Sequence, residues 1–308
     1  MRRAWRILLT VAVLAGVIWY FRDLDVRALR AALARADWTL VAAAGAANLV
    51  LNTAARVKRW QALLPPSPRS AQRPRPWFLA NVLLASYATN AVLPFRAGEA
   101  VRTLALRDRH GYPVMTLVAT QLVEKLVEML SFVSFALPLA FSPVPAAMPT
   151  VLGVGACGWL AVLLIVRLAR SEHQPHHRLW RRLLGRLGEA VRVLREPGAW
   201  LRSFGWALTS HAVDIAMIAM CARALDVHVG FLGWCAVLIT VNIAILLPSS
   251  PAQLGVLEAG AVIVLASIGV PRDAALAFAL AYHAAHVLPT ALAGGLALAT
   301  NQLARVPA

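Results

Sequence analysis

The chain has 308 residues, of which 60% are hydrophobic and 14% are charged, and its formal net charge at pH 7 is +16. Soluble domains contain about a quarter charged residues, so this composition excludes a soluble fold. The basic residues lie between apolar runs, which is the positive-inside pattern of membrane proteins. A nucleic-acid-binding protein gathers them into a patch instead, and we therefore expect no nucleic-acid partner.

Several apolar runs exceed the ~18 residues that mark a membrane-spanning helix. We predict an all-α polytopic membrane protein with about seven to nine membrane helices and two re-entrant or broken-helix hairpins in an internal repeat. The chain, 1–308, is expected to form one integral-membrane domain with a first half (1–170), a basic cytoplasmic linker (170–199) and a second half (200–308). The expected location is a bacterial inner membrane, with multiple passes and a cytoplasmic N-terminus.

The first helix is predicted over about 4–21, retained because no small-residue cleavage site follows it. Residues 22–37 mix charges with leucines at helical spacing, which indicates a short amphipathic helix on the outer surface. A second helix is predicted over about 38–57. The connection after it reads as a cytoplasmic loop with little regular structure, because it is proline-rich and its charges are all basic. These charges are Arg56, Lys58, Arg59, Arg69, Arg73 and Arg75.

The next apolar run, 77–93, is short for a membrane span, and arginines follow it as well as precede it. A crossing would place a second basic block outside, so we interpret 77–106 as a re-entrant hairpin that bends near Pro94–Gly98. Non-helical backbone at membrane depth is tolerated only where it is buried in protein or lines a wet cavity. The hairpin is therefore expected to form part of a cavity wall.

A long helix over about 113–141 is followed by one over about 150–168. The basic segment 167–202 then repeats leucines at helical spacing, which indicates an amphipathic helix on the anionic cytoplasmic surface. This segment is also the place where a cytosolic or membrane partner protein is expected to dock.

A helix over about 200–222 opens the second half. Two apolar runs, 231–247 and 256–270, flank a break at Pro248–Gly255 and form either a second hairpin or two ordinary spans. The last helix is predicted over about 274–300. Few charges flank the elements after 231, so their orientation stays open.

The first hairpin carries four candidate substrate-binding residues: Asn90, Arg96, Glu99 and Arg102. Glu99 and Arg102 are three apart, so they share a face of a helix that begins near Gly98. The arginines suit a lipid phosphate, with Glu99 positioning them or contacting a cationic head group. The alternative is that the arginines are interface anchors that Glu99 neutralises.

Glu124, Lys125 and Glu128 are further candidates, in the middle of an apolar helix. A charge at the bilayer centre costs about 2.5–3.5 kcal/mol, so these side chains should face the bundle interior and find partners there. Glu124 and Glu128 share a face, and Arg96 or Arg102 is the expected partner of Glu124. A purely structural ion pair is the alternative.

The second break is polar and not basic. Its candidate substrate-binding residues are Asn242, Ser250, Gln253 and Glu258. Glu258 has no basic neighbour in the sequence, so its cation would come from the cargo or from the first hairpin; capping of helix ends is the alternative reading.

Two further pairs of polar residues share a helix face each, at a spacing of three. The pairs His211/Asp214 and His283/His286 are interpreted as helix–helix hydrogen bonding and not as metal ligands. We expect no metal and no cofactor, since the three cysteines form no CxxC and no nucleotide-binding or nucleophile motif occurs.

Three segments together resemble the lysylphosphatidylglycerol synthase transmembrane family, also called the flippase-like domain family. They are LPFRAGEAVR (93–102), VEKLVE (123–128) and LPSSPAQLGVLEAG (247–260). In the best-known members, the resemblance implies, this membrane part moves an aminoacylated phospholipid that a separate cytosolic domain synthesises. The end at Ala308 predicts that the synthase domain is absent. Other stand-alone members are linked to hopanoid or lipid-linked glycan metabolism, which leaves the cargo open.

The sequence therefore predicts a lipid translocase that binds a phospholipid or polyprenyl-phosphate head group between two broken-helix hairpins. Its partners would be membrane lipids, either anionic phospholipids or lipid-linked phosphates. Two alternatives stay open: an enzyme that uses Glu99, Glu124 or Glu258 as general base on a lipid-linked substrate, and an accessory subunit. We favour a protein without enzymatic activity, because no nucleophile or metal motif accompanies these acids.

Overall fold

The computed structural model describes residues 25–93, 97–136, 139, 160, 197–246 and 251–300. Every regular element in these ranges is a helix, which confirms the all-α class. The helices predicted over 4–21 and 150–168, and most of the basic segment 167–202, lie outside these ranges. The helices are α2 (Val26–Arg35), α3 (Trp38–Leu63), α4 (Pro76–Val92), α5 (Gly98–His110), α6 (Val114–Ala136), α9 (Pro197–Ala224), α10 (Phe231–Leu246), η3 (Pro251–Gln253), α11 (Val256–Ser267) and α12 (Arg272–Ala299).

Three of the described helices are long and apolar enough to cross a membrane: α3, α9 and α12. Shorter apolar helices lie within α10 and α11. α6 has 23 residues but carries three charged side chains near its centre. This combination is that of a multi-pass membrane protein whose interior accommodates charge.

α3 and α9 run antiparallel and make the most extensive helix contact in the described structure. The backbone N–H of Asp37, before α3, donates to the carbonyl of Ala224 at the end of α9, at 2.9 Å. Further along, Asn52 contacts Ser210. Trp38 and Ala224 therefore lie on the same side of the molecule, as the charge pattern predicts; which side faces the cytoplasm stays a prediction.

The predicted end of the second helix, at about 57, is wrong. α3 continues to Leu63, because no helix breaker precedes Pro65 and the residues between are good helix formers. Arg56, Lys58 and Arg59 therefore lie on a helix and not in a loop. The side chain of Arg59 is only 1% exposed, so its charge has a partner inside the protein.

The loop that follows, 64–75, lacks regular structure as predicted, and it packs on the end of α5. The hydroxyl of Ser67 donates to the carbonyl of His110 at 3.0 Å, and the Tyr112 hydroxyl donates to the carbonyl of Pro65 at 2.7 Å. Burial raises the pKa of Tyr112 to about 12, so its hydroxyl remains a donor at neutral pH. The loop thus fixes the end of the first hairpin.

The first hairpin has the predicted helix–break–helix form, α4 followed by α5. The side-chain oxygen of Asn90 accepts a hydrogen bond from the N–H of Gly98 at 2.8 Å, which joins the two helices across the break. A Cβ at position 98 would lie 2.1 Å from the carbonyl oxygen of Ser86, so only glycine permits this approach. Residues 94–96 lie outside the described ranges, and re-entry into the membrane stays a prediction.

The second hairpin is formed by α10, η3 and α11, and its break contacts α4 of the first hairpin. Within the break, Ala252 and Gln253 have φ values of 55° and 62°, and Gly255 has a φ of 85°. Left-handed backbone at non-glycine residues costs about 1–3 kcal/mol each, so the surrounding structure must impose it. The break of the second hairpin thus packs against the first hairpin, although an internal repeat stays a prediction.

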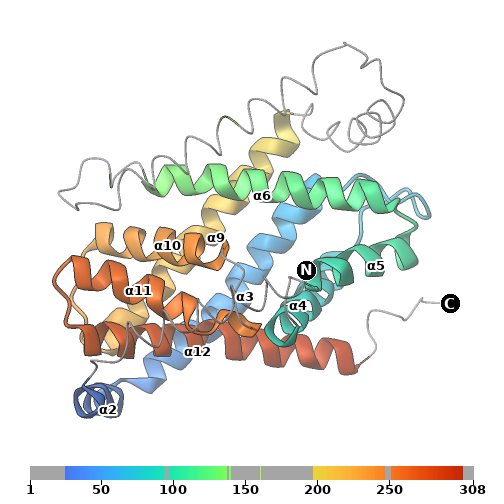
Figure 1. Ribbon diagram of the computed structural model, residues 1–308. Coiled ribbons are helices and arrows are strands. Elements are labelled where there is room, and N and C mark those ends of the chain that lie inside the picture. The colour runs from blue at the N-terminus through green and yellow to red at the C-terminus, as the bar shows by residue number, and fades with distance from the viewer. Residues whose placement is uncertain are drawn as a thin grey trace, which may run out of the picture.

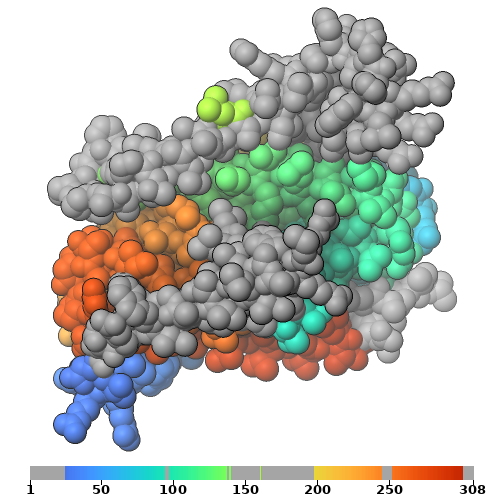
Figure 2. Space-filling view, in the orientation of Figure 1, coloured from blue at the N-terminus to red at the C-terminus, as the bar shows by residue number. Residues whose placement is uncertain are grey.

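The remaining long helices enclose this arrangement. α6 lies along one side of the molecule and α12 along the other, and α3 and α9 pass between them (Figure 1). The space-filling view shows α6 packed against α5 at one end and against α10 at the other (Figure 2). α2 is capped by Asp25 and packs on α12 without a fully buried residue, as expected of a surface helix.

The contact between α12 and α4 provides a test of the packing. A Cβ at Gly294 would lie 2.0 Å from the carbonyl oxygen of Leu84, whereas one at Gly295 would meet nothing within 4 Å. We expect Gly294→Ala to lower the free energy of unfolding by about 1–3 kcal/mol through overpacking. Gly295→Ala, the matched control, should raise it slightly because alanine favours helix. Thermal unfolding in detergent measures both, and equal effects would contradict the packing.

Candidate functional site

Glu124 of α6 is the centre of a buried ionic network. One carboxylate oxygen accepts from Arg59 of α3 at 2.8 Å, and the other accepts from Arg102 of α5 at 2.5 Å. The side chains of these three residues are each no more than 6% exposed. Arg102 also lies over the ring of Trp60, with its guanidinium carbon 4.1 Å from the ring centroid. The sequence predicts Arg96 or Arg102 as the partner of Glu124; the structure shows Arg102, together with Arg59, which was not predicted.

Glu128 extends the network one helical turn further, on the same face of α6 as predicted. Its carboxylate lies 3.8 Å from Arg59 and 3.8 Å from Arg56, both on α3. Lys125 reaches it from the side, with Nζ 2.8 Å from the carboxylate oxygen. Acidic side chains on two turns of α6 thus face basic side chains on α3, beside an apolar contact of Leu63 with Val123 and Val127.

α9 contributes a third acid, Asp214. Its carboxylate accepts from Asn48 at 3.0 Å and from Asn52 at 2.5 Å, and it lies 3.9 Å from Arg56. Asn52 in turn accepts from the Nε of Arg56 at 2.7 Å. The expectation of helix–helix hydrogen bonding for Asp214 is therefore confirmed, and it links α3 to α9.

Two residues of the network reach its rim. Glu99 lies 3.4 Å from Arg102, as the i, i+3 spacing predicts, and its side chain is one-third exposed. Lys125 is 41% exposed although its Nζ contacts a buried carboxylate. Arg102 itself is buried, so the alternative interpretation of it as an interface anchor is wrong.

The network is balanced in charge but not in hydrogen bonds. Among the described residues it joins four basic side chains, Arg56, Arg59, Arg102 and Lys125, to four acidic ones, Glu99, Glu124, Glu128 and Asp214. Yet the Nε groups of Arg59 and Arg102 are buried without a hydrogen-bond acceptor in the described structure. A buried donor without an acceptor costs about 1–3 kcal/mol, so these N–H groups favour an additional anionic or polar group.

The second hairpin presents a separate pair. Nδ1 of His283 on α12 lies 2.5 Å from one carboxylate oxygen of Glu258, and the other oxygen accepts from the N–H of Gly255 at 2.7 Å. Nε2 of His283 lies 3.0 Å from the carbonyl oxygen of Ala252. The prediction that the cargo or the first hairpin supplies the partner of Glu258 is wrong, because α12 supplies a histidine that lies 25 residues further along the chain.

The remaining candidates fare differently. Arg96 and Ser250 lie outside the described residues. Asn242 donates to the carbonyl of Leu238 within its own helix, at 2.8 Å, and Gln253 is a half-buried residue of the break. Asn90 serves the hairpin through Gly98 and is only half-buried. The structure therefore unites Glu99, Arg102, Glu124, Lys125 and Glu128 but does not join Asn242 to them.

The sequence-based interpretation missed the contribution of α3. Asn48, Asn52, Arg56 and Arg59 follow one another at intervals of four, four and three, which places them on one helix face. Polar residues at that spacing in an apolar helix indicate a buried polar stripe. The signal was present, but the early predicted end of the helix separated the arginines from the asparagines.

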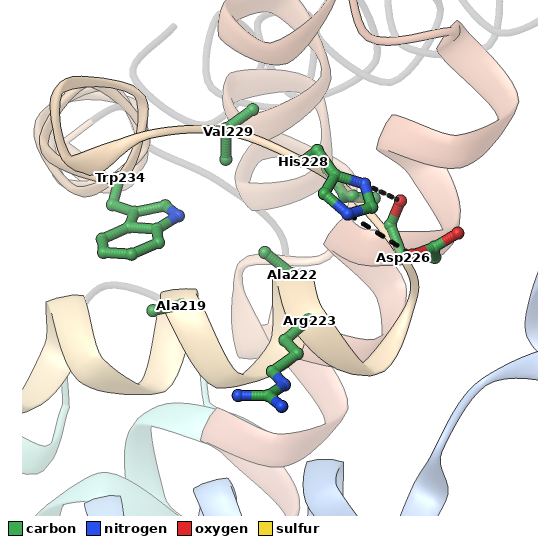
Figure 3. Close-up of a pocket in the computed structure, with 8 residues that line it drawn as sticks. Ala219, Ala222, Arg223, Asp226, His228, Val229 and Trp234 are labelled. Atoms are coloured by element: carbon green, nitrogen blue, oxygen red, sulfur yellow. Dashed lines mark hydrogen bonds and ion pairs between the residues drawn. The ribbon is translucent and has the colours of Figure 1, made fainter.

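A cavity of about 280 Å³ lies at the C-terminal end of α9, between the turn 225–230 and α10 (Figure 3). Arg223, His228 and Trp234 contribute to its lining. The ring of His228 contacts Asp226. Nδ1 of His228 lies 3.1 Å from the backbone carbonyl oxygen of Asp226, and Nε2 lies 3.7 Å from the Asp226 carboxylate (Figure 3). Both of these side chains are exposed, so the cavity does not share the buried character of the network.

Comparison with known proteins gives one finding. The family model described as lysylphosphatidylglycerol synthase TM region matches residues 7–294, nearly the whole chain. No curated protein is significantly similar to the chain. Within the described residues, no group of three or more His, Cys, Asp or Glu side chains is arranged to bind a metal.

The network predicts that its members depend on one another for stability. Glu124→Leu leaves Arg59 and Arg102 buried with less counter-charge, and we expect it to lower the free energy of unfolding by about 3–5 kcal/mol. Adding Arg102→Met should recover part of that loss, because both partners of one pair are then apolar. Thermal unfolding in detergent measures the cycle.

Lys125→Met is the matched control on the same helix. Its side chain is partly exposed, so a change of only about 1 kcal/mol or less is expected. Additive losses in the Glu124→Leu/Arg102→Met double variant would contradict a direct pairing of these two residues.

Proposed function

The chain belongs to the lysylphosphatidylglycerol synthase transmembrane family, and we propose from this premise that it is a lipid translocase. It binds the anionic head group of a phospholipid or polyprenyl phosphate beside the buried network, while the lipid tails stay in the bilayer. The family supports a role in lipid metabolism or translocation, and the geometry of the network supports an anionic ligand.

The observation that carries the proposal is the excess of buried donors. Arg59 and Arg102 each keep an Nε–H without an acceptor in the described structure, next to carboxylates that already accept from them. Phosphate oxygens suit guanidinium groups in charge and in geometry. In this proposal a phosphate enters at the rim, beside Glu99, and moves inward to the two buried Nε–H groups, where it gains charge-assisted hydrogen bonds that the protein alone does not complete.

The surface beside the rim suits the rest of a lipid. Val118 and Leu122 are 46% and 47% exposed and share a face of α6 with Lys125, at intervals of four and three. A cation at one end of an exposed apolar stripe matches an amphipathic ligand, with the head group at Lys125 and the tails along the leucine and valine. A free inorganic anion would gain nothing from that stripe.

Movement of the head group involves the two hairpins in this proposal. The break of the second hairpin contacts α4 of the first, so a displacement of either hairpin shifts the packing of the other. No nucleotide-binding motif occurs in the sequence, and we propose alternating access or sliding of the head group without ATP hydrolysis. Irregular backbone next to a wet groove is where such folds bind their substrates.

The proposal assigns no covalent step to the chain. Glu124 has both carboxylate oxygens in contact with arginine, and Glu258 has one oxygen on His283 and the other on Gly255. A general base needs a free lone pair directed at substrate, so neither acid is placed for that role. We propose a transporter and not an enzyme.

Reconstitution tests the translocase. Purified protein in liposomes should move a fluorescent anionic phospholipid between leaflets, and a labelled polyprenyl phosphate in a parallel arm distinguishes the two cargo classes. Glu99→Gln should slow this movement about tenfold, because it removes one charge-assisted contact of roughly 1.5 kcal/mol at the rim, and the partly exposed, isosteric substitution preserves folding.

Arg107→Gln is the matched control on α5, since Arg107 is exposed and its ion pair in the described structure is with its neighbour Asp108. Its rate should equal that of the unaltered protein. Failure of every labelled lipid to move would contradict the translocase. Movement at the normal rate in Glu99→Gln would contradict the site and not the function.

A further inference from the structure

The Glu258–His283 pair has a property that follows from its hydrogen bonds. Nε2 of His283 lies 3.0 Å from the Ala252 carbonyl, which can only accept, so Nε2 carries a hydrogen. Nδ1 lies 2.5 Å from a carboxylate oxygen of Glu258, and that contact also needs a hydrogen between its two atoms. Both contacts exist together only when the pair holds one proton more than neutral histidine and ionised glutamate.

The extra proton can lie at either of two positions, and both allow His283 to bond Glu258 and Ala252 at the same time. It lies either on Nδ1, giving imidazolium and carboxylate, or on Glu258, giving neutral imidazole and carboxylic acid. When it leaves, one hydrogen remains on the ring for two acceptors. His283 then keeps the hydrogen bond at the ring nitrogen that retains the hydrogen and loses the other one, either to Glu258 or to Ala252.

We propose that Glu258 and His283 form a proton-binding site that fastens the break of the second hairpin to α12. The bound proton closes both contacts, and its loss releases one of them. The ligand of this site is the proton itself.

The backbone of the break explains why release has a consequence. Ala252 and Gln253 are left-handed without being glycine, a conformation that persists only when neighbouring contacts impose it. The His283 contact is on the carbonyl of Ala252 itself, and Glu258 accepts from Gly255 at the other end of the break. Loss of the proton therefore allows the break to relax at the point where it contacts α4.

Other titratable groups surround the pair and have to be distinguished from it. His286, one turn along α12, interacts electrostatically with His283, with Asp214 of α9 and with Arg56 of α3. The remaining titratable side chains on the elements packed against α11 and α12 include Tyr282 on α12 itself, Cys221 and His211 on α9, Cys235 on α10, Tyr87 on α4, and Arg27, Arg30 and Arg35 on α2.

Glu258→Gln separates the pair from these groups. The glutamine amide donates to Nδ1 while its oxygen accepts from Gly255, so a neutral His283 keeps both of its contacts without a bound extra proton. All other titratable groups remain in place. The variant therefore serves as the permanently fastened form.

The experiment places a nitroxide on Leu254→Cys, which is 56% exposed within the break, in full-length protein whose native cysteines are replaced by alanine. The protein is studied in lipid nanodiscs between about pH 5 and pH 10, which spans the ordinary range of histidine. We expect the electron paramagnetic resonance spectrum to sharpen as the pH rises in the parent protein. It should stay broad throughout in Glu258→Gln.

A pH-independent spectrum in the parent protein would overturn the proposal, and so would equal sharpening in Glu258→Gln, which would assign the titration to another group. The link to transport depends on the proposed function and is read separately. Sharpening without movement of any lipid in liposomes leaves the proton site and contradicts the translocase. Lipid movement with a pH-independent spectrum supports the translocase and contradicts the proton site.

Discussion

The arrangement of the helices depends on the position of Glu124 between two arginines. Its carboxylate joins α6 to α3 through Arg59 and to α5 through Arg102, with all three side chains buried. Charges inside a membrane protein are costly unless each has a counter-charge, so the three helices are constrained to the positions at which the pairs close. The apolar contacts around them tolerate more variation, because alternative apolar packings often cost little.

The same constraint connects fold and function. A site that binds an anion needs cations, but unpaired cations would not remain buried. The network keeps its arginines buried by pairing them with Glu124, Glu128 and Asp214. Some of their guanidinium N–H groups still have no acceptor in the described structure. For the proposed phosphate ligand such a site would be preorganised, since the arginines are already fixed by their acids and would lose little freedom on binding. The second hairpin carries the Glu258–His283 pair instead, for which we propose one bound proton. Such a pair suits a conformational role better than the binding of a lipid head group.

Much of this was predictable from the sequence, and the failures have physical causes. Spacing within one helix was reliable: Glu99 with Arg102, and Glu124 with Glu128, lie as the 3.6-residue period requires. Partners on distant helices were not, because nothing local indicates that His283 meets Glu258. The assumption that arginines near a helix end reach water concealed Arg59, which is neutralised inside the protein by a residue 65 positions later.

The long sequence separations within the network bear on biogenesis. α3 enters the membrane with Arg56 and Arg59, but Glu124 follows Arg59 only 65 residues later, and Asp214 comes later still. An arginine at a helix centre costs about 2.5–3.5 kcal/mol on insertion and less near an end, so α3 carries an uncompensated cost until its acidic partners arrive. Arg59 gains its counter-charges once α6 has followed, whereas the pairing of Arg56 with Asp214 has to wait for α9 in the second half of the chain.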